Sequence, residues 1–319
     1  MKKVLIIRTG AIGDVVETTG LVHALNNAGW CVDYLTGETP ARLLKDSPEI
    51  NKIFILYGKR YSNIFKTALR LSKEKYDLIL NLQPSLRMKT LAKLTCSKKI
   101  VNYKKSYKYH AVENFFVTGK KAIPELELDK NIKLFTDNAI KQKMQAELGT
   151  AKPKICFNTG ASRARQGRKW CLENWIKLAG LIFDKYDVQI FIVGNKEDGE
   201  NAKELLETFP QIKSFAGITT IEETAGLLAN ADLVISGDTG PLHIASASGT
   251  TCIGLYGSCP PERSGPYGEN HHYIASDLSC SPCDKKVCKY IKSETDDTPC
   301  MRDIKPEDVL NLVDTILKK

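Results

Sequence analysis

Long hydrophobic runs are absent from this sequence of 319 residues. No stretch approaches the roughly 18 consecutive apolar residues that a helix needs to cross a bilayer. Two lysines precede the apolar run at residues 4–7, as in a signal peptide, but Arg8 ends that run. Internal repeats and low-complexity tracts are also absent. We therefore expect a cytoplasmic globular protein, as its 42% hydrophobic and 26% charged content also indicates.

Acidic residues are missing between Asp77 and Glu113. The cations inside that gap are Arg87, Lys89, Lys93, Lys98, Lys99, Lys104, Lys105 and Lys108. Residues 1–150 as a whole carry 26 Lys and Arg against 14 Asp and Glu, whereas the remainder carries 20 against 23. This asymmetry favours an anionic partner or an anionic surface for the first half. A solvated basic surface without a specific role is the alternative.

A complete dinucleotide fingerprint is absent as well. The apolar residues 4–7 lead into Gly10 and Gly13, but the third glycine of the fingerprint is missing. This departure argues against a nicotinamide-dependent enzyme. The segment still predicts a strand, a glycine turn and a helix over residues 15–25, with Asp14 as the acid at the turn.

A second strand, glycine turn and helix is expected at residues 233–247. Three apolar residues precede Gly237, and Pro241 falls in the first helical turn, where its missing N–H costs least. Free amides and the positive end of the helix dipole make such a helix start attract an anion, most commonly a phosphate. The segment therefore predicts a phosphorylated ligand that meets the amides of Thr239 and Gly240, with His243 within one turn of them.

The alternation of apolar runs and helical patterns predicts the fold class. We expect strands at residues 4–7, 31–35, 53–56 and 78–82, and again at 154–158, 188–193, 233–236 and 252–256. Near-continuous apolar strands separated by helices are typical of a parallel sheet that is covered on both faces. We predict an α/β protein with two doubly wound domains, 1–150 and 151–319, that meet near residues 149–153. Pro306 is expected to start a last amphipathic helix, 306–318.

Ten cysteines in a chain without an export signal argue against a disulfide framework. Four of them are close together in the sequence: Cys280, Cys283, Cys288 and Cys300. The spacing of the first pair lets both sulfurs reach one ion, and four thiolates suit tetrahedral zinc. The later spacings match no common zinc module. Free thiols, a disulfide pair and an iron–sulfur cluster remain alternatives to a structural zinc site.

Five segments in order resemble the lipopolysaccharide heptosyltransferase family, glycosyltransferase family nine. They are residues 8–14 (RTGAIGD), Lys169-Trp170, residues 238–243 (DTGPLH), 254–258 (GLYGS) and 265–268 (GPYG), followed by the cysteine-rich tail. The resemblance covers nearly the whole chain. It implies a GT-B fold, in which two Rossmann-like domains face each other across a cleft. It also implies that the last helix crosses back to the first domain.

The first glycine turn provides the candidate catalytic base. Inverting sugar transfer to a hydroxyl needs one carboxylate to take the proton of that hydroxyl. Asp14 either fills this role or caps the helix that follows it, and the resemblance favours the base. The candidate acceptor-binding residues are Arg8, Gly13, Lys98, Lys99, Lys104 and Lys105.

The candidate donor site belongs to the second half. Lys169 lies in a basic loop with Arg163, Arg165 and Arg168, and can neutralise the charge that develops on a leaving diphosphate. A surface loop without a ligand is the alternative, and Trp170 is expected to pack. The other candidate donor-binding residues are Thr159, Glu200, Asp238, Thr239, Gly240 and His243.

Two acids of the donor site have particular expected roles. Asp238 is expected to bind sugar hydroxyls or to orient its turn. An acid after the strand at 188–193 suits ribose hydroxyls, and among Glu197, Asp198 and Glu200 we choose Glu200.

These expectations combine into one function and one alternative. The resemblance implies an inverting, metal-independent glycosyltransferase that moves a sugar, heptose from ADP-heptose, to a lipid-linked inner-core lipopolysaccharide acceptor at the cytoplasmic face of the inner membrane. No cofactor is expected for catalysis. The alternative is a non-catalytic nucleotide-sugar or nucleic-acid binding module, because Tyr103, Tyr107 and Tyr109 alternate with lysines. We expect no nucleic acid, since donor-type loops have no use in an RNA binder.

Overall fold

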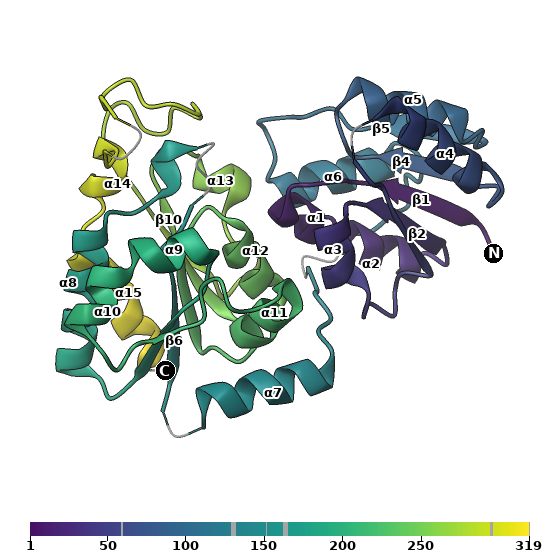
Figure 1. The fold of residues 1–319 in the computed structure, drawn as a ribbon. Coiled ribbons are helices and arrows are strands. Elements are labelled where there is room, and N and C mark those ends of the chain that lie inside the picture. The colour runs from purple at the N-terminus through teal and green to yellow at the C-terminus, as the bar shows by residue number, and fades with distance from the viewer. Residues whose placement is uncertain (59, 129–131, 151, 162–164, 294–295, 319) are drawn as a thin grey trace. The chain divides into compact units, whose positions relative to one another are not determined.

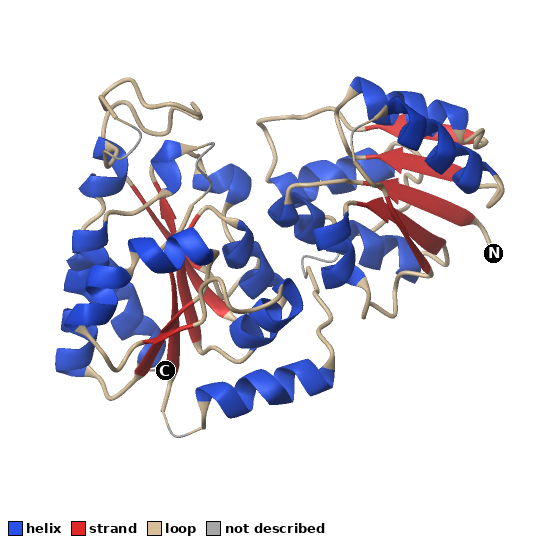
Figure 2. Ribbon diagram, viewed as in Figure 1, coloured by secondary structure: helices blue, strands red, loops and turns tan. Residues whose placement is uncertain are grey.

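The structure is a computed structural model and describes all residues except 59, 129–131, 151, 162–164, 294–295 and 319. The chain forms two compact units, Met1–Thr136 and Asp137–Lys319. Each unit contains one parallel sheet with helices packed around it (Figures 1 and 2). The predicted α/β class with two doubly wound domains is confirmed.

The sheet of the first unit has five strands: β1 (Lys3–Ile7), β2 (Cys31–Thr36), β3 (Lys52–Ile55), β4 (Leu78–Asn81) and β5 (Lys99–Asn102). Their order is β3-β2-β1-β4-β5, and every neighbouring pair is parallel. The chain therefore reverses its direction across the sheet between β1 and β4. In an open parallel sheet, ligands bind beyond the carboxyl ends of the strands at such a switch point.

The helices of the first unit are α1 (Ile12–Glu17), α2 (Thr19–Asn27), α3 (Glu38–Leu44), α4 (Tyr61–Ser72), α5 (Leu86–Leu94) and α6 (Ala111–Lys120). The single helix expected at 15–25 is divided at Thr18. The Thr18 hydroxyl donates to the Val15 carbonyl at 2.6 Å and lies 2.6 Å from the Tyr34 hydroxyl. These local bonds compete with the helical ladder and separate α1 from α2.

The sheet of the second unit has six strands: β6 (Lys154–Asn158), β7 (Gln189–Ile192), β8 (Lys213–Ser214), β9 (Leu233–Gly237), β10 (Thr251–Tyr256) and β11 (His272–Ala275). Their order is β11-β10-β9-β6-β7-β8, with parallel pairing between neighbours. The switch point of this sheet lies between β6 and β9. Both of these strands are apolar and buried.

The helical elements of the second unit are α7 (Asn138–Leu148), the 3₁₀ turn η1 (Gln166–Arg168), α8 (Leu172–Lys185), α9 (Lys196–Asn201), α10 (Lys203–Thr208), α11 (Ile221–Ala229), α12 (Gly240–Ala247), α13 (Pro261–Ser264), α14 (Pro299–Asp303) and α15 (Pro306–Leu317). A capping box starts α11 as its sequence predicts: the Thr220 hydroxyl accepts from the Glu223 amide at 3.3 Å, and the Glu223 carboxylate accepts from the Thr220 amide at 2.9 Å.

Helices α7 and α15 both belong to the second unit. Helix α7 is part of the second unit, so the chain divides after Thr136 and not near residues 149–153. The physical reason is that α7 packs against α11, where Lys143 pairs with Glu223 at 2.6 Å. Helix α15 also belongs to the second unit, because Val309 and Val313 are buried in its core and α15 packs against α8.

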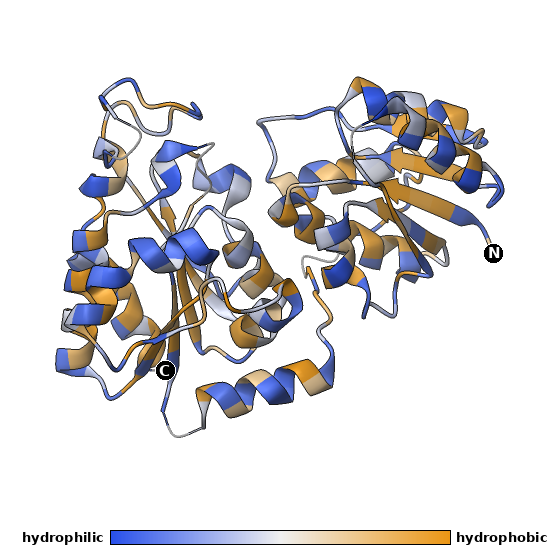
Figure 3. Cartoon of the chain, in the orientation of Figure 1, coloured by the Kyte–Doolittle hydropathy of each residue, from blue (hydrophilic) through white to orange (hydrophobic). Residues whose placement is uncertain are grey.

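The apolar core of the second unit fixes the loop that follows β6. Trp170 is 2% exposed, packs edge-on against Trp175 with 4.9 Å between ring centroids, and donates its indole N–H to the Ile304 carbonyl. The expectation that Trp170 packs is confirmed. Figure 3 shows the apolar residues concentrated in the sheets of the two units. No helix in the described part of the chain is both long and apolar enough to cross a membrane.

Candidate active site

At the switch point of the first sheet, the segments that follow β1 and β4 are hydrogen-bonded to each other. The Arg8 guanidinium, only 7% exposed, donates to the Leu82 carbonyl at 2.7 Å. The Thr9 amide donates to the Gln83 side chain at 3.4 Å. The segments that follow these two strands therefore meet at the carboxyl edge of the sheet, where its topology predicts a ligand.

Asp14 lies at this switch point. Its carboxylate forms an ion pair with Arg8 and accepts a hydrogen bond from the Ala11 amide at 3.2 Å. The hydrogen bond from the Ala11 amide is a helix-capping contact at the start of α1, so Asp14 does cap this helix. The side chain nevertheless remains 37% exposed. A carboxylate that is held by an arginine and an amide, and still reaches solvent, is able to accept a proton from a bound hydroxyl.

A cavity of about 270 Å³ opens beside this turn in the first unit. It is lined from the carboxyl ends of β1 to β4 and from the first turns of α4 and α5, by Thr9, Gly37, Leu56, Gly58, Ile64, Gln83, Ser85, Arg87 and Met88. Its polar groups are an amide, hydroxyls and one guanidinium. Such a lining suits a hydroxyl-rich, anionic ligand.

The candidate acceptor-binding residues do not all lie together. Lys98 and Lys99 are at the amino end of β5, where Lys98 pairs with Asp77 at 2.7 Å and Lys99 donates to the Ala122 carbonyl. Lys104 and Lys105 follow the carboxyl end of the same strand. The two pairs therefore lie at opposite ends of the short strand β5. Only the second pair lies at the edge that carries Arg8 and the buried Gly13.

The switch point of the second sheet is bridged by Asn158 at the end of β6. Its side-chain amide donates to the Ser236 hydroxyl at 2.9 Å and to the Thr239 hydroxyl at 2.7 Å. Helix α12 starts directly after Thr239, with Pro241 in its first turn as predicted. Gly237 is required here, because a Cβ at this position would lie 2.2 Å from the Arg168 carbonyl oxygen.

Asp238 is the centre of a polar cluster behind this helix start. Arg168 Nη2 lies 2.7 Å from its Oδ2, His243 Nε2 lies 3.3 Å from its Oδ1, and the Ser264 hydroxyl donates to its Oδ2 at 3.1 Å. Burial alone would raise the pKa of Asp238, but the His243 hydrogen bond and the Arg168 charge hold that pKa below its ordinary value. Of the two expected roles of Asp238, the geometry supports orientation of the turn, because the carboxylate is 2% exposed.

Two further candidate donor residues lie on the segment after β6. Thr159 is buried, and its hydroxyl has no hydrogen-bond partner among the residues that the structure describes. Lys169 is exposed, and its positive charge offsets part of the rise that burial causes in the pKa of Asp198. Arg163, expected to share the role of Lys169, lies outside the described residues.

The acids after β7 have different positions. Asp198 is buried and caps α9, because its carboxylate accepts from the Asn195 amide at 2.8 Å. Burial raises the pKa of Asp198 above its ordinary value. Gly160 gives it room, since a Cβ on Gly160 would lie 2.0 Å from the Asp198 carboxyl carbon. Glu200 is exposed on α9 and takes no part in that cap.

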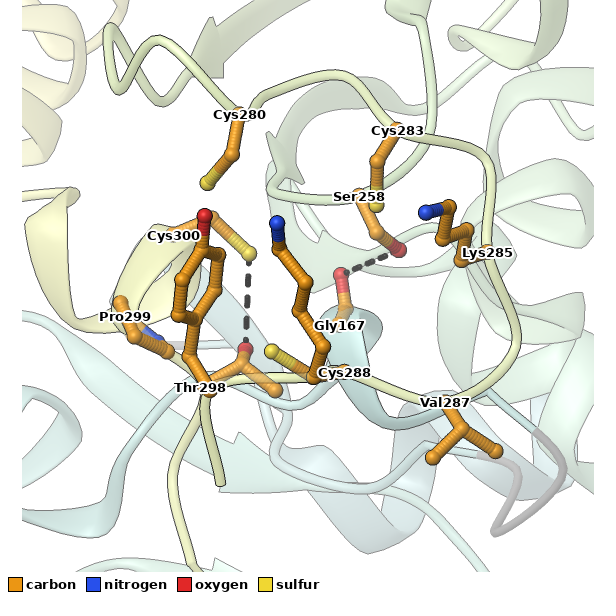
Figure 4. Close-up of a pocket in the computed structure, with 12 residues that line it drawn as sticks. Gly167, Ser258, Cys280, Cys283, Lys285, Val287, Cys288, Thr298, Pro299 and Cys300 are labelled. Carbon is orange, nitrogen blue, oxygen red and sulfur yellow. Dashed lines mark hydrogen bonds between the residues drawn. The ribbon is translucent and has the colours of Figure 1, made fainter.

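The four clustered cysteines line one cavity of about 210 Å³ (Figure 4). Cys300 is buried and donates to the Thr298 hydroxyl at 3.5 Å, whereas Cys283 is exposed. Burial raises the pKa of the Cys300 thiol. In the conformation described, no group of three or more His, Cys, Asp or Glu side chains has an arrangement that could hold a metal ion, as far as the described residues go.

The cysteine-rich segment is fastened to the loop after β6. Asp284 pairs with Arg165 at 2.8 Å and with Arg263 at 2.7 Å. The Gln166 backbone amide donates to the Lys286 carbonyl, and the Gln166 side-chain oxygen accepts from the Cys288 amide at 2.9 Å. Sequence reasoning identified the arginines and the cysteines separately but not this connection.

Known proteins resemble the chain over most of its length. Residues 64–293 match the family described as glycosyltransferase family 9 (heptosyltransferase). Lipooligosaccharide heptosyltransferase 2 of Campylobacter jejuni serotype O:2 is 27% identical over 264 residues, which cover 80% of each chain.

Solved structures show the same architecture. A family 9 glycosyltransferase from Veillonella parvula superposes with a TM-score of 0.84 at 19% identity, covering 99% of this chain and 97% of that one. ADP-heptose lps heptosyltransferase II of E. coli gives a TM-score of 0.79 at 18% identity, covering 99% and 98%. These likenesses confirm the GT-B fold. Because the family match spans well over half of the sequence, the chain belongs to glycosyltransferase family 9, the heptosyltransferase family, and is a glycosyltransferase.

Proposed function

We propose that this enzyme transfers heptose from ADP-heptose to the inner core of lipopolysaccharide, with inversion and without a catalytic metal. The names of the relatives supply the sugar, the donor and the acceptor class. The observation that carries the chemistry is Asp14, an accessible carboxylate that Arg8 holds at the switch point of the first sheet.

The proposed reaction is a single displacement. The acceptor hydroxyl gives its proton to the Asp14 carboxylate while its oxygen forms a bond to the anomeric carbon of the heptose. The bond from that carbon to the diphosphate oxygen breaks, and ADP leaves with the electron pair. One carboxylate suffices because the diphosphate is already a good leaving group, whereas hydrolysis by paired acids would need two.

The second unit is proposed to bind the donor. The amides of Thr239 and Gly240 at the start of α12 and the buried Thr159 hydroxyl would bind the diphosphate. Lys169 would neutralise the charge that develops on it. His243 would donate a hydrogen bond to an oxygen of the phosphate or the sugar, and it also contacts the Asp238 carboxylate. Glu200 is proposed to bind the ribose hydroxyls, since Asp198 is already occupied by its cap.

The first unit is proposed to bind the acceptor at the cytoplasmic face of the inner membrane. Arg8 and Gly13 follow the carboxyl end of β1, and Lys104 and Lys105 follow that of β5; we propose that these four residues bind the acceptor together with the cavity that Thr9 lines. The hydroxyls, the Gln83 amide and the Arg87 guanidinium among its lining residues suit an anionic core saccharide. Lys98 and Lys99 lie at the opposite edge, so we omit them from the saccharide site.

We propose that Cys280, Cys283, Cys288 and Cys300 bind one structural zinc ion. The support is that four sulfurs line one cavity and that the segment carries Lys285, Lys286 and Lys289, which would balance the negative charge of four thiolates. Because the described conformation does not bring three such groups together, binding would require the cysteine side chains to turn toward one another.

The function is tested with purified protein, ADP-heptose and deacylated lipopolysaccharide core in the presence of a metal chelator. We expect ADP release that matches glycosylated product in amount, and a product whose anomeric configuration by NMR is opposite to that of the donor. UDP- and GDP-sugars serve as controls. Tight ADP binding without turnover would contradict the proposed transfer, and retention at the anomeric carbon would contradict the single displacement.

A further inference from the structure

Helix α4 presents an apolar stripe to solvent. Tyr61, Phe65 and Leu69 are 56%, 55% and 67% exposed. Residues that are four apart in a helix lie on the same face, so these side chains form one row. The opposite face of α4 is used by the fold, because Ile64 and Ala68 are buried in the core of the first unit.

Helix α5 packs beside α4 and also carries exposed apolar side chains (Figure 1). Leu86 at its start is 75% exposed, and Leu94 at its end is 38% exposed. Figure 3 shows hydrophobic and hydrophilic positions close together on these two helices. A contiguous exposed apolar patch on a soluble domain usually marks an interaction site.

The part of the chain that contains α4 and α5 is strongly basic. Residues 50–112 contain 15 Lys and Arg but only two acids, Glu74 and Asp77. Glu74 is paired with Lys3 and Lys52, and Asp77 is paired with Lys98. Neither α4 nor α5 contains an acid, and their exposed cations are Lys66, Arg70, Lys89 and Lys93.

We propose that the exposed face of α4 and α5 docks on an anionic lipid bilayer. Tyr61, Phe65, Leu69 and Leu86 would enter the interfacial region, and the four exposed cations would bind anionic headgroups. Aromatic and aliphatic side chains flanked by Lys and Arg, without acids, match the chemistry of a membrane surface. The choice of lipid as the occupant rests on the proposed function, whose acceptor is lipid-linked.

Helices α4 and α5 also line the cavity that we assign to the acceptor. Ile64 on the inner side of α4 and Arg87 and Met88 on α5 line the cavity that we assign to the acceptor saccharide. The same two helices would therefore touch the bilayer with one face and form part of the saccharide site with the other. This arrangement would place the saccharide site next to the membrane surface from which a lipid-linked saccharide projects.

The test is co-sedimentation with vesicles of phosphatidylcholine alone and of phosphatidylcholine with phosphatidylglycerol, at low and at physiological salt. Each cation near an anionic surface contributes about fivefold in affinity, so the Lys66→Glu/Arg70→Glu variant should bind the mixed vesicles at least about 25-fold more weakly. Phe65→Ser/Leu69→Ser should also lose binding, and this loss should persist at low salt. Unchanged vesicle binding in both variants would overturn the proposal.

Matched controls come from the second unit. Ile218 and Tyr273 are 74% and 49% exposed, so Ile218→Ser/Tyr273→Ser removes comparable exposed apolar groups. Lys203→Glu/Lys292→Glu changes the net charge by the same amount as the α4 reversal. We expect both controls to bind vesicles like the wild type. Equal losses in the controls would mean that net charge or overall stability, and not the α4–α5 face, governs binding.

Two further measurements separate this inference from the proposed function. Transfer to a deacylated acceptor should be unchanged in the α4 variants, whereas transfer to an acceptor embedded in mixed vesicles should fall in parallel with binding. If the wild type transfers to neither acceptor but still binds vesicles through α4, the proposed function fails and the docking surface stands. If analytical ultracentrifugation shows a dimer that Phe65→Ser/Leu69→Ser dissociates, the face binds a second copy of the chain and the lipid assignment is overturned.

Discussion

The Arg168 guanidinium holds Asp238 at two points: Nη2 lies 2.7 Å from the carboxylate Oδ2, and Nη1 donates to the Asp238 carbonyl at 2.8 Å. This pair ties the loop after β6 to the turn after β9, on the two sides of the switch point. The Gly237 position admits no Cβ because the Arg168 backbone passes so close to it. The start of α12 is thus positioned by the buried Asp238 and the partly buried Arg168.

Asp238→Asn should lower stability and change its dependence on pH. The pKa of Asp238 is held low in the folded state, so its contribution is present above the unfolded-state pKa of about 4 and is lost as the pH falls through the lower folded-state value. We expect the free energy of unfolding of the variant to be about 3 kcal/mol lower than that of the wild type near neutral pH. On acidification, the variant should lose less of this free energy than the wild type does. Urea unfolding between about pH 7 and pH 3 measures both effects.

Asp187→Asn is the matched control for this prediction. Asp187 pairs with Lys152, but its side chain is 81% exposed, so its removal should cost less than about 1 kcal/mol. A similar effect of the two substitutions would show that burial of the Arg168–Asp238 pair is without consequence.

Asp14→Asn should lower turnover by about a hundredfold or more, with ADP affinity unchanged, because the amide cannot take the proton of the acceptor hydroxyl. Glu38→Gln, at the first turn of α3, is the control acid at a helix start of the same unit. Single-turnover kinetics and calorimetry with ADP supply the two measurements. If Asp14 acts only as a cap, the variant will melt at a lower temperature and turn over normally.

Lys169→Ala and His243→Ala should each weaken ADP binding, but by different routes. Lys169 is exposed, so its loss should reduce affinity by about tenfold without changing the melting temperature. His243 is 6% exposed and bonded to Asp238, so its loss should reduce both affinity and stability. Lys152→Ala is the control for a lost surface cation. Unaltered ADP affinity in both variants would remove the donor site from α12 and its neighbouring loop.

Protein purified under reducing conditions should contain about one zinc per chain. Acidification should release the metal, because the thiolates that bind it take up protons. Cys280→Ser/Cys283→Ser should lose the metal, whereas Cys96→Ser, an exposed cysteine of the first unit, should retain it. Elemental analysis that finds no zinc, with all four thiols open to alkylation, would identify them as free cysteines. Iron in place of zinc would indicate an iron–sulfur cluster.

The central strands could be predicted from the sequence, because β1, β4, β6 and β9 are short apolar runs buried on both faces. The edge strands β5, β8 and β11 could not, since polar residues such as Lys99, Lys213 and His272 interrupt their apolar pattern. The division of the first helix at Thr18 also escaped prediction, because it depends on the distant Tyr34 hydroxyl.

In the candidate site, too, local features could be predicted from the sequence and contacts between distant residues could not. Glycine turns at strand ends identified Asp14 and the start of α12, since those signals are local. The partners of these groups come from far along the chain, as with Arg168 and Asp238 or Asn158 and Ser236. Lys98, Lys99, Lys104 and Lys105 are close in the sequence, but the sequence alone does not show that β5 places the first pair at its amino end and the second pair beyond its carboxyl end.

The membership of α7 in the second unit has a consequence for the order of synthesis. Met144 and Leu148 on α7 are buried, and Asn230 at the end of α11 donates to the Lys141 carbonyl at 2.9 Å. On the ribosome, α7 emerges well before α11, so its apolar side must wait for a partner while the strands of the second unit are still being made. A nascent chain that stops at Thr136 has a complete first sheet, whereas one that stops at Thr150 also carries an uncovered helix. Fragments with these two ends should therefore differ in their tendency to aggregate, with the longer one the worse.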